Sequence, residues 1–221
     1  MKQWMSWVVT ALIAVALFTP AFADDTKPPI KVACVGDSIT AGVGTRDSGK
    51  DAYPAQLGRM LGDQYDVHNF GVSGATLLNK GDKPYQKEGA FHQALELKPD
   101  VVVIMLGTND TKPQNWKFKD EFSADYKDLV GQFAALPSKP KIYVCHPVDV
   151  PGPGNYGIND AGLAVEMPMI ETLAKEMGLT VIDLHTPFVG KPELLPDRVH
   201  PNTDGATLMA KTVAASLIAK Q

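Results

Sequence analysis

The chain has 221 residues, a formal net charge of −4 and a hydrophobic fraction of 44%. A chain of this length accommodates one domain with an adequate core. The acidic balance disfavours nucleic acids and anionic membranes as partners, because both repel a negatively charged protein. We therefore expect neither as a partner.

Residues 1–23 have the layout of a secretory signal peptide. A single lysine near the start is followed by an apolar stretch over residues 7–18, and small residues end the segment at Ala23. The apolar stretch is short for a membrane span, so a transmembrane helix is the less favoured alternative. We predict cleavage after Ala23, a secreted or periplasmic location, and one domain over residues 24–221 with no stable membrane association.

From residue 30 onward, short β-rich apolar runs alternate with longer segments of helical periodicity. Strands are predicted over residues 30–35, 65–70, 100–106, 141–146 and 179–184, and helices over 53–61, 91–97, 121–136, 158–177 and 202–219. The valine and isoleucine content suits strands buried on both faces. This alternation predicts an α/β fold, a single three-layer α/β/α sandwich around a five-stranded parallel sheet.

Small and polar residues cluster where the predicted strands end. In doubly wound sheets the ligand site lies outside the carboxyl ends of the strands, so these residues are expected to share one edge. Three segments follow predicted strands: Gly36-Asp37-Ser38, Gly71-Val72-Ser73-Gly74 and Gly107-Thr108-Asn109-Asp110. The fourth, the DRVHPN run at 197–202, lies in the loop before the last predicted helix and is expected at the same edge.

A serine, a histidine and an aspartate at this edge fit the requirements of nucleophilic catalysis. Ser38 supplies a hydroxyl, and His200 is the best candidate base. Asp197 lies three residues before His200, close enough in a turn to bind one imidazole nitrogen and stabilise the imidazolium. We predict that the catalytic residues are Ser38, Asp197 and His200.

Serine catalysis also needs hydrogen-bond donors for the oxyanion that forms when a carbonyl is attacked. Three candidates follow from the same edge: the backbone N–H of Ser38, the backbone N–H of Gly74 and the side-chain amide of Asn109. Gly74 qualifies because a residue without a side chain permits close approach. Asp37 and Asp110, beside two of these residues, are expected to accept backbone N–H bonds and shape the loops.

The four segments together resemble the sequence blocks of the SGNH (GDSL) hydrolases. GDSIT at 36–40, the glycine of VSGAT, GTND at 107–110 and DRVHPN at 197–202 occur in the family's order. The resemblance implies a flavodoxin-like SGNH hydrolase fold, Ser38 as nucleophile, Gly74 and Asn109 as oxyanion donors, and Asp197 and His200 completing the triad. Arg198 departs from the family pattern, where a small residue such as glycine is frequent.

A narrower resemblance, in GTNDTKPQNW and NFGVSGATLL, is to secreted bacterial acylhydrolases of the sialate O-acetylesterase-like and acetylxylan-esterase-like type. It implies removal of small acyl groups, chiefly acetyl, from carbohydrate esters. One alternative is a lysophospholipase or thioesterase acting on longer acyl chains, which would need a broad apolar channel. A more remote alternative is a non-catalytic carbohydrate-binding module.

Three further residues are candidates for substrate contacts. Trp116 and Tyr156 lie in polar loops, where each either stacks on a sugar ring or anchors its own loop. His146 ends the fourth predicted strand near the site. The other histidines share no spacing typical of a metal centre, and we expect no metal and no organic cofactor.

Two features remain open or are set aside. Cys34 and Cys145 each lie inside a predicted strand, and the sequence leaves open whether they form a disulfide or stay free thiols. Residues 44–50 nearly match a phosphate-binding loop. Asp51 stands where that motif has a serine or threonine, and the segment does not directly follow a strand, so we set this reading aside.

Overall fold

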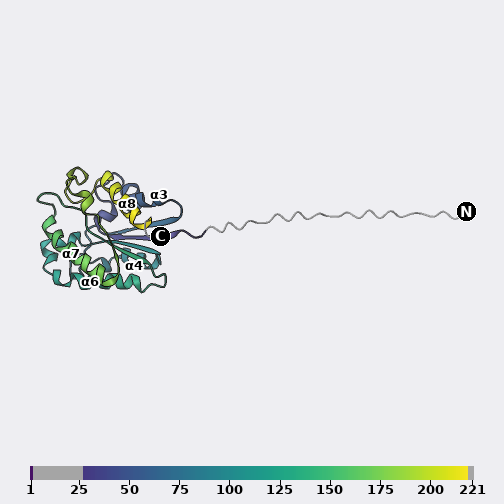
Figure 1. Cartoon of the computed structure of the whole chain (residues 1–221), viewed down its shortest axis with the longest axis horizontal. Helices are drawn as coiled ribbons and strands as arrows, with labels where there is room; N and C mark the ends of the chain where they lie inside the picture. Colours follow the sequence, from purple (N-terminus) through teal and green to yellow (C-terminus); the bar gives the residue numbers. More distant parts are fainter. Residues whose placement is uncertain (2–26, 219–221) are drawn as a thin grey trace.

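The computed structural model describes Met1 and residues 27–218 (Figure 1). The predicted signal peptide therefore lies, apart from Met1, outside the described residues. The described part contains a five-stranded, all-parallel sheet in the order β2-β1-β3-β4-β5. This is the flavodoxin-like strand order, which confirms the predicted α/β fold. The strands are β1 (Ile30–Gly36), β2 (Tyr65–Gly71), β3 (Val101–Met105), β4 (Lys141–Cys145) and β5 (Thr180–Ile182).

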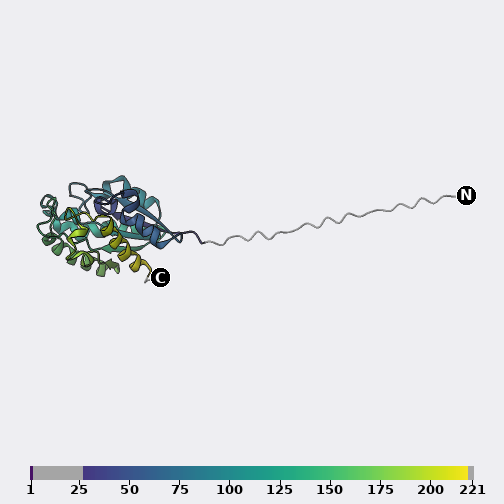
Figure 2. The ribbon, with the colours of Figure 1, turned by 90° about the horizontal axis from the view of Figure 1, so that it is seen from above.

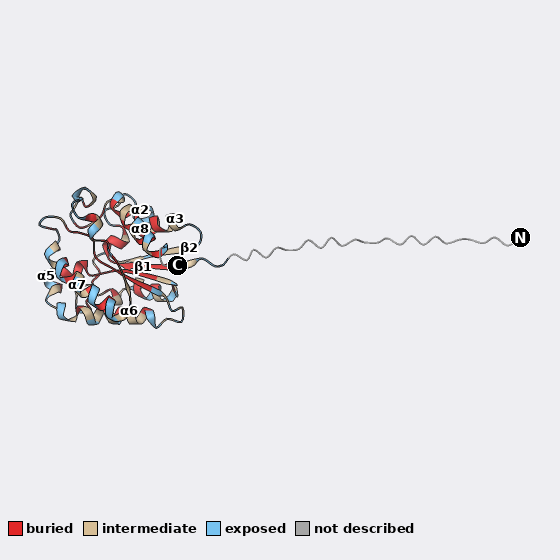
Figure 3. Ribbon diagram, in the orientation of Figure 1, coloured by how far each residue is buried: buried red, intermediate tan, exposed pale blue. Residues whose placement is uncertain are grey.

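Helices cover both faces of the sheet, as Figures 1 and 2 show. On one face, α3 (Tyr53–Leu61) and α8 (Thr203–Ile218) pack against each other and enclose one hydrophobic core. On the other face, α4 (Gly89–Glu96), α6 (Phe122–Ala134) and α7 (Asp160–Met177) enclose a second core. Figure 3 shows the buried strands between these two layers. The short elements are α1 (Ser38–Ala41), α2 (Ser48–Asp51), α5 (Pro113–Trp116), η1 (Tyr85–Lys87), η2 (Thr108–Thr111), η3 (Lys119–Glu121), η4 (Thr186–Phe188) and η5 (Pro192–Leu194).

The central and edge strands of the sheet differ in how far their residues are buried. β1 is central, pairs with both β2 and β3, and is fully buried from Val32 to Gly36. β2 is an edge strand whose residues are mostly half-buried, so the expectation that every strand is buried on both faces was wrong for it. An edge strand lacks one neighbour, which leaves one side of it open to solvent.

Helix α7 begins two residues later than predicted because of its cap. The side chain of Asn159 accepts a hydrogen bond from the N–H of Gly162, which makes Asn159 the N-cap. Ile158 is thereby left in the preceding loop, where it is 3% exposed. The helix ends at Gly178, which adopts the left-handed conformation that commonly terminates helices.

The two cysteines are free and buried in the same hydrophobic core. Burial raises the pKa of the Cys34 thiol to about 12 and raises the pKa of Cys145 as well. Neither thiol is reactive in this environment. Within residues 27–218, no helix is long and apolar enough to cross a membrane.

Candidate active site

Ser38 is the first residue of α1, directly after β1. The carboxylate of Asp37 caps this short helix by accepting a hydrogen bond from the N–H of Ile39 at 2.9 Å. Gly42 ends the helix in the left-handed conformation. The chain therefore turns sharply at the carboxyl edge of the sheet, and the Ser38 side chain emerges there, 6% exposed. This is the edge at which doubly wound sheets hold their ligands.

The structure places His200 beside Ser38, and Asp197 beside His200. The Ser38 Oγ lies 2.9 Å from the His200 Nε2. The other ring nitrogen of His200, Nδ1, lies 2.7 Å from the Asp197 Oδ2. The geometry gives a continuous hydroxyl–imidazole–carboxylate chain, in which Nε2 can accept the serine proton while Nδ1–H donates to the carboxylate.

The Asp197 carboxylate is held in its ionised form. Partial burial raises the pKa of Asp197, but hydrogen bonds from the His200 backbone N–H, the His200 imidazole and the Val199 backbone N–H outweigh it, so the pKa is lowered overall. Arg198, within this turn, has φ +71°, the left-handed region that favours glycine. This backbone conformation gives a physical reason why glycine suits that position.

The predicted oxyanion donors lie around the same cavity. Gly74 and Asn109 line it together with Ser38 and His200. The Asn109 Nδ2 donates to the carbonyl oxygen of Ala75 at 3.1 Å and lies 3.4 Å from the Asp37 Oδ2, at the long end of hydrogen-bond distances. One amide hydrogen is therefore firmly bound and the other only weakly.

Asp37 and Asp110 form a buried carboxyl layer behind these donors. Burial raises the pKa of Asp37 to about 6 and that of Asp110 to about 7. The Asp110 carboxylate accepts the backbone N–H groups of Leu77 and Leu78 at 2.9 and 2.7 Å. Both carboxyls thus accept backbone N–H bonds, as predicted, and Asp110 ties the β3–η2 turn to the loop after β2.

The cavity at Ser38 has a volume of about 200 Å³. Its lining includes three residues that the sequence did not single out as contacts: Ser73, Lys112 and Ile158. Ser73 belongs to the Gly71–Gly74 segment already recognised and Lys112 lies two residues after Asp110, so proximity along the chain was the available signal. Ile158 was hidden because it fits the helical period that continues into α7.

Tyr156 lies at the mouth of this cavity. Its hydroxyl donates to the Asp197 Oδ2 at 3.3 Å, and its ring centroid lies 5.7 Å from that of His200. The neighbouring Asn155 donates from Nδ2 to the Asp197 carbonyl oxygen at 3.0 Å. The Tyr156 side chain is exposed, so one face of its ring is open to a ligand. The structure therefore places this candidate contact beside His200, the candidate base.

Trp116 and His146 lie outside this cavity. The Trp116 ring packs edge-on against the Phe122 ring, with 6.0 Å between the ring centroids, and it contacts the hydrophobic core. Trp116 therefore anchors its own loop, which is one of the two alternatives that the sequence left open. His146 lines a separate cavity with Glu171, Asp183 and His185. Neither side chain is among the residues that line the Ser38 cavity.

In the part of the chain that the structure describes, one group of side chains has the spacing to hold a metal ion. One ligand atom from each of Asp149, Asp160 and His185 lies within 4.8 Å of the others. The His185 Nε2 binds the Asp160 Oδ1 at 2.9 Å. None of these three residues is among those that line the Ser38 cavity.

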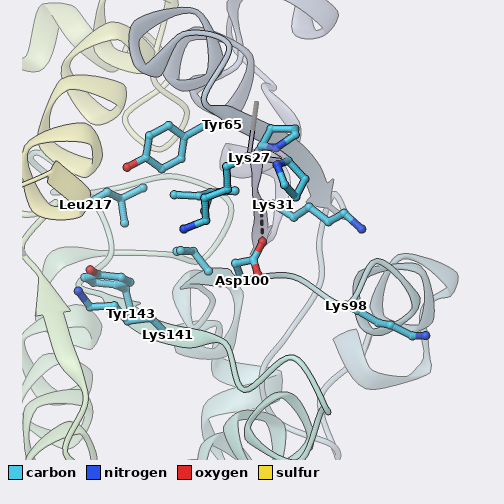
Figure 4. Close-up of a pocket in the computed structure, with 12 residues that line it drawn as sticks. Lys27, Lys31, Tyr65, Lys98, Asp100, Lys141, Tyr143 and Leu217 are labelled. Atoms are coloured by element: carbon cyan, nitrogen blue, oxygen red, sulfur yellow. Dashed lines mark hydrogen bonds between the residues drawn. The ribbon is translucent and has the colours of Figure 1, made fainter. Parts of the chain in front are cut away.

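A larger cavity, about 600 Å³, lies at the opposite end of the strands (Figure 4). Lysines and tyrosines line it, and the Lys31 N–H donates to the Asp100 Oδ2 there at 2.9 Å. Its lining residues include no serine, cysteine or histidine. Its size therefore does not make it a competing catalytic site.

Residues 34–208 match the family model of the GDSL-like lipase/acylhydrolase family, and the chain belongs to that family. An acetylxylan esterase of Xylanibacter ruminicola is 43% identical over 207 residues. That match covers 85% of this chain but 43% of the relative, so the chain spans less than half of the relative's length.

Solved structures share the fold. A candidate arylesterase from Agrobacterium tumefaciens has a TM-score of 0.71 at 25% identity, covering 87% of this chain and 100% of that one. An acetyl xylan esterase, AlAXEase, has a TM-score of 0.68 at 24% identity, and the match covers 85% of this chain and 100% of that one. At this low identity these likenesses show a shared fold.

Proposed function

We propose that this protein is a serine esterase that removes acetyl groups from carbohydrate esters. The observation that carries the proposal is the aligned chain from the Ser38 hydroxyl through His200 to Asp197, at 2.9 and 2.7 Å, in a cavity that Asn109 and Gly74 line. Acyl transfer by serine needs this arrangement of nucleophile, base and donors.

The reaction follows from the positions of these groups. The Ser38 Oγ attacks the ester carbonyl carbon as its proton passes to the His200 Nε2, and the imidazolium is stabilised by Asp197. The carbonyl oxygen becomes an oxyanion that the N–H groups of Ser38 and Gly74 and the amide of Asn109 bind.

Collapse of this intermediate breaks the ester C–O bond, and His200 gives its proton to the departing sugar oxygen. The acyl group is then held on Ser38. A water molecule, deprotonated by His200, attacks the acyl carbon and releases the carboxylic acid together with the free serine. No step calls for a metal or an organic cofactor.

Three observations support a small acyl group on a carbohydrate. The relative of 43% identity is an acetylxylan esterase. The cavity at Ser38 has a volume of about 200 Å³ and Ile158 forms part of its wall, a size that suits a small acyl group. The exposed ring of Tyr156 beside His200 offers a surface on which a sugar ring can stack.

We also propose a secreted or periplasmic location, which the composition of residues 1–23 supports. Immunoblotting of a cell fraction against the exported fraction, with N-terminal sequencing of the exported form, tests it. A first residue of Asp24 is expected. Retention of the intact chain in the cytoplasm would refute the location and leave the chemistry untouched.

Hydrolysis of p-nitrophenyl acetate and release of acetate from acetylated xylan test the activity. Ser38→Ala is expected to lower kcat by roughly 10⁴-fold or more. Ser216→Ala, which removes a hydroxyl bound within α8, is the control and is expected to retain full activity. A preference for acyl chains of eight carbons or more would favour the long-chain alternative, and equal rates in the Ser38→Ala variant and the unmodified protein would refute the mechanism.

A further inference from the structure

Glu166 is a buried carboxyl group that the proposed mechanism does not use. It lies on α7, is 0% exposed, and neither Oε1 nor Oε2 has a hydrogen-bond partner among the described residues. A buried carboxylate without a partner is very unfavourable, whereas a neutral carboxylic acid is tolerated. Burial, with the charges of Asp110 and Asp37, raises the pKa of Glu166 well above its usual range.

The carboxyl group of Glu166 lies against the backbone of the turn that carries Asn109. A Cβ added at Gly107 would come within 1.8 Å of the Glu166 Oε1 and 2.6 Å of its Cδ. Gly107 has φ +125°, a conformation that side-chain-bearing residues rarely adopt. Glu166 therefore fills the space in which Gly107 would carry a side chain, two residues before Asn109.

Helix α7 contacts the same turn one helical turn earlier. A Cβ added at Gly162 would lie 2.8 Å from the Cβ of Thr111, at the end of η2. Residues four apart share one face of a helix, so Gly162 and Glu166 present a single surface to the segment from Gly107 to Thr111. The turn that bears Asn109 thus rests on α7 at both of its ends.

The charges around Glu166 also affect the proposed oxyanion hole. The titratable groups that face Glu166 are Asp110, Asp37 and Tyr126, from η2, the β1–α1 turn and α6. None of these can supply a compensating positive charge. An ionised Glu166 would add a negative charge behind the Asn109 amide. The proposed reaction forms an oxyanion next to this amide, so the added charge would weaken the stabilisation of the oxyanion.

We propose that Glu166 is a positioning residue that, as a neutral carboxylic acid packed against Gly107, holds the Gly107–Asn109 turn and keeps additional negative charge away from the oxyanion hole. This inference rests on the proposed esterase function. Glu166 is not among the residues that line the Ser38 cavity, so its effect is transmitted through the placement of Asn109. An interaction needed only in the transition state changes kcat and leaves KM nearly constant.

Kinetics of p-nitrophenyl acetate hydrolysis test the positioning role with two variants. Glu166→Gln keeps the shape and the neutrality of the group, and its kcat is expected to stay within about twofold of the unmodified protein. Glu166→Ala leaves a gap beside Gly107 and is expected to lower kcat by roughly 10- to 100-fold with little change in KM. Glu176→Gln, an exposed position on the same helix that pairs with Lys127, is the control.

Thermal unfolding from pH 4 to pH 9 tests the neutral state without any substrate. The raised pKa means that the folded protein favours the neutral form of Glu166. The contribution of this neutral group to the stability of the folded protein is complete below the unfolded pKa of about 4.3, and it is lost as pH rises toward the folded pKa. Glu166→Gln cannot ionise. The Tm of Glu166→Gln minus the Tm of the unmodified protein is therefore expected to increase as pH rises.

Three results would overturn the inference. Parallel Tm curves for Glu166→Gln and the unmodified protein would show that Glu166 is not held neutral. An unchanged kcat in Glu166→Ala, or a kcat in Glu166→Gln as low as that in Glu166→Ala, would refute the positioning role. An unmodified protein with no esterase activity refutes the proposed function itself, so the two failures are distinguishable.

Discussion

Gly44 lies directly against His200, the proposed catalytic base. A Cβ added at Gly44 would come within 3.0 Å of the His200 Cβ and 2.7 Å of the Pro201 carbonyl oxygen. Gly44 also has φ +95°, in the left-handed region. This glycine, part of a segment that nearly spells a phosphate-binding loop, instead allows the loop after α1 to pack against the turn that presents His200.

Gly44→Ala is expected to displace His200 and to lower kcat by roughly 10-fold or more, because small errors in the position of a base are costly. Gly62→Ala is the matched control: Gly62 has φ +71° but no atom within 4 Å of an added Cβ. It should lose about 1 kcal/mol of unfolding free energy through backbone strain and keep its kcat. Equal activities of the two variants would show that the contact with His200 has no catalytic consequence.

Asn109→Ala removes a side-chain donor from the proposed oxyanion hole. We expect kcat for p-nitrophenyl acetate to fall by about 100- to 1000-fold with a small change in KM, since the hydrogen bond is formed to the oxyanion. Asn109→Asp keeps the shape but exchanges the donor for a negative charge, and should be at least as damaging. A loss below about fivefold in Asn109→Ala would place the donor elsewhere.

The lowered pKa of Asp197 predicts how stability depends on pH. A carboxylate with a lowered pKa in the folded state stabilises the protein above the unfolded pKa of about 3.9, and that stabilisation is lost as pH falls through the folded pKa. Asp197→Asn lacks this contribution. The Tm difference between the unmodified protein and Asp197→Asn should therefore shrink as pH falls from 6 to 3, and a constant difference would contradict the prediction.

Ile158→Ala is expected to enlarge the cavity at Ser38. Ile158 is buried in a small cluster with Val150, Leu163 and Val199, and it also lines the cavity. The ratio of kcat/KM for p-nitrophenyl butyrate to that for the acetate should rise several-fold, because a methylene in an apolar pocket changes discrimination by roughly 10-fold or more. Val150→Ala, in the same cluster but outside the lining, controls for lost packing and should leave the ratio unchanged.

The sheet and the ends of its strands were predictable because the signals are local. β-branched residues mark each strand, and glycine, aspartate and asparagine mark the turns that follow. A parallel sheet then brings all the carboxyl ends to one edge, so the approach of Ser38, Gly74 and Asn109, which follow β1, β2 and β3, required no knowledge of side-chain packing.

What the sequence could not show depends on contacts between distant segments. Ile158 continues the apolar period of a helix, and only the capping of α7 by Asn159 leaves it facing Ser38. Glu166 lies at helical spacing from the buried Leu163 and Ile170, but a glutamate is usually solvated, and its complete burial follows from the docking of α7 on the β3–η2 turn. Residue type alone therefore did not predict a buried carboxyl group at this position.

The hydroxyl and the imidazole that meet at 2.9 Å are separated by 162 residues along the chain. Ser38 follows β1, the first strand of this sheet along the chain, whereas His200 lies beyond β5, just before α8. During synthesis the proposed nucleophile is therefore made long before the proposed base, and the proposed reaction requires both segments to be folded. The onset of the proposed hydrolysis during refolding would accordingly report when the segments that carry Ser38 and His200 have come together.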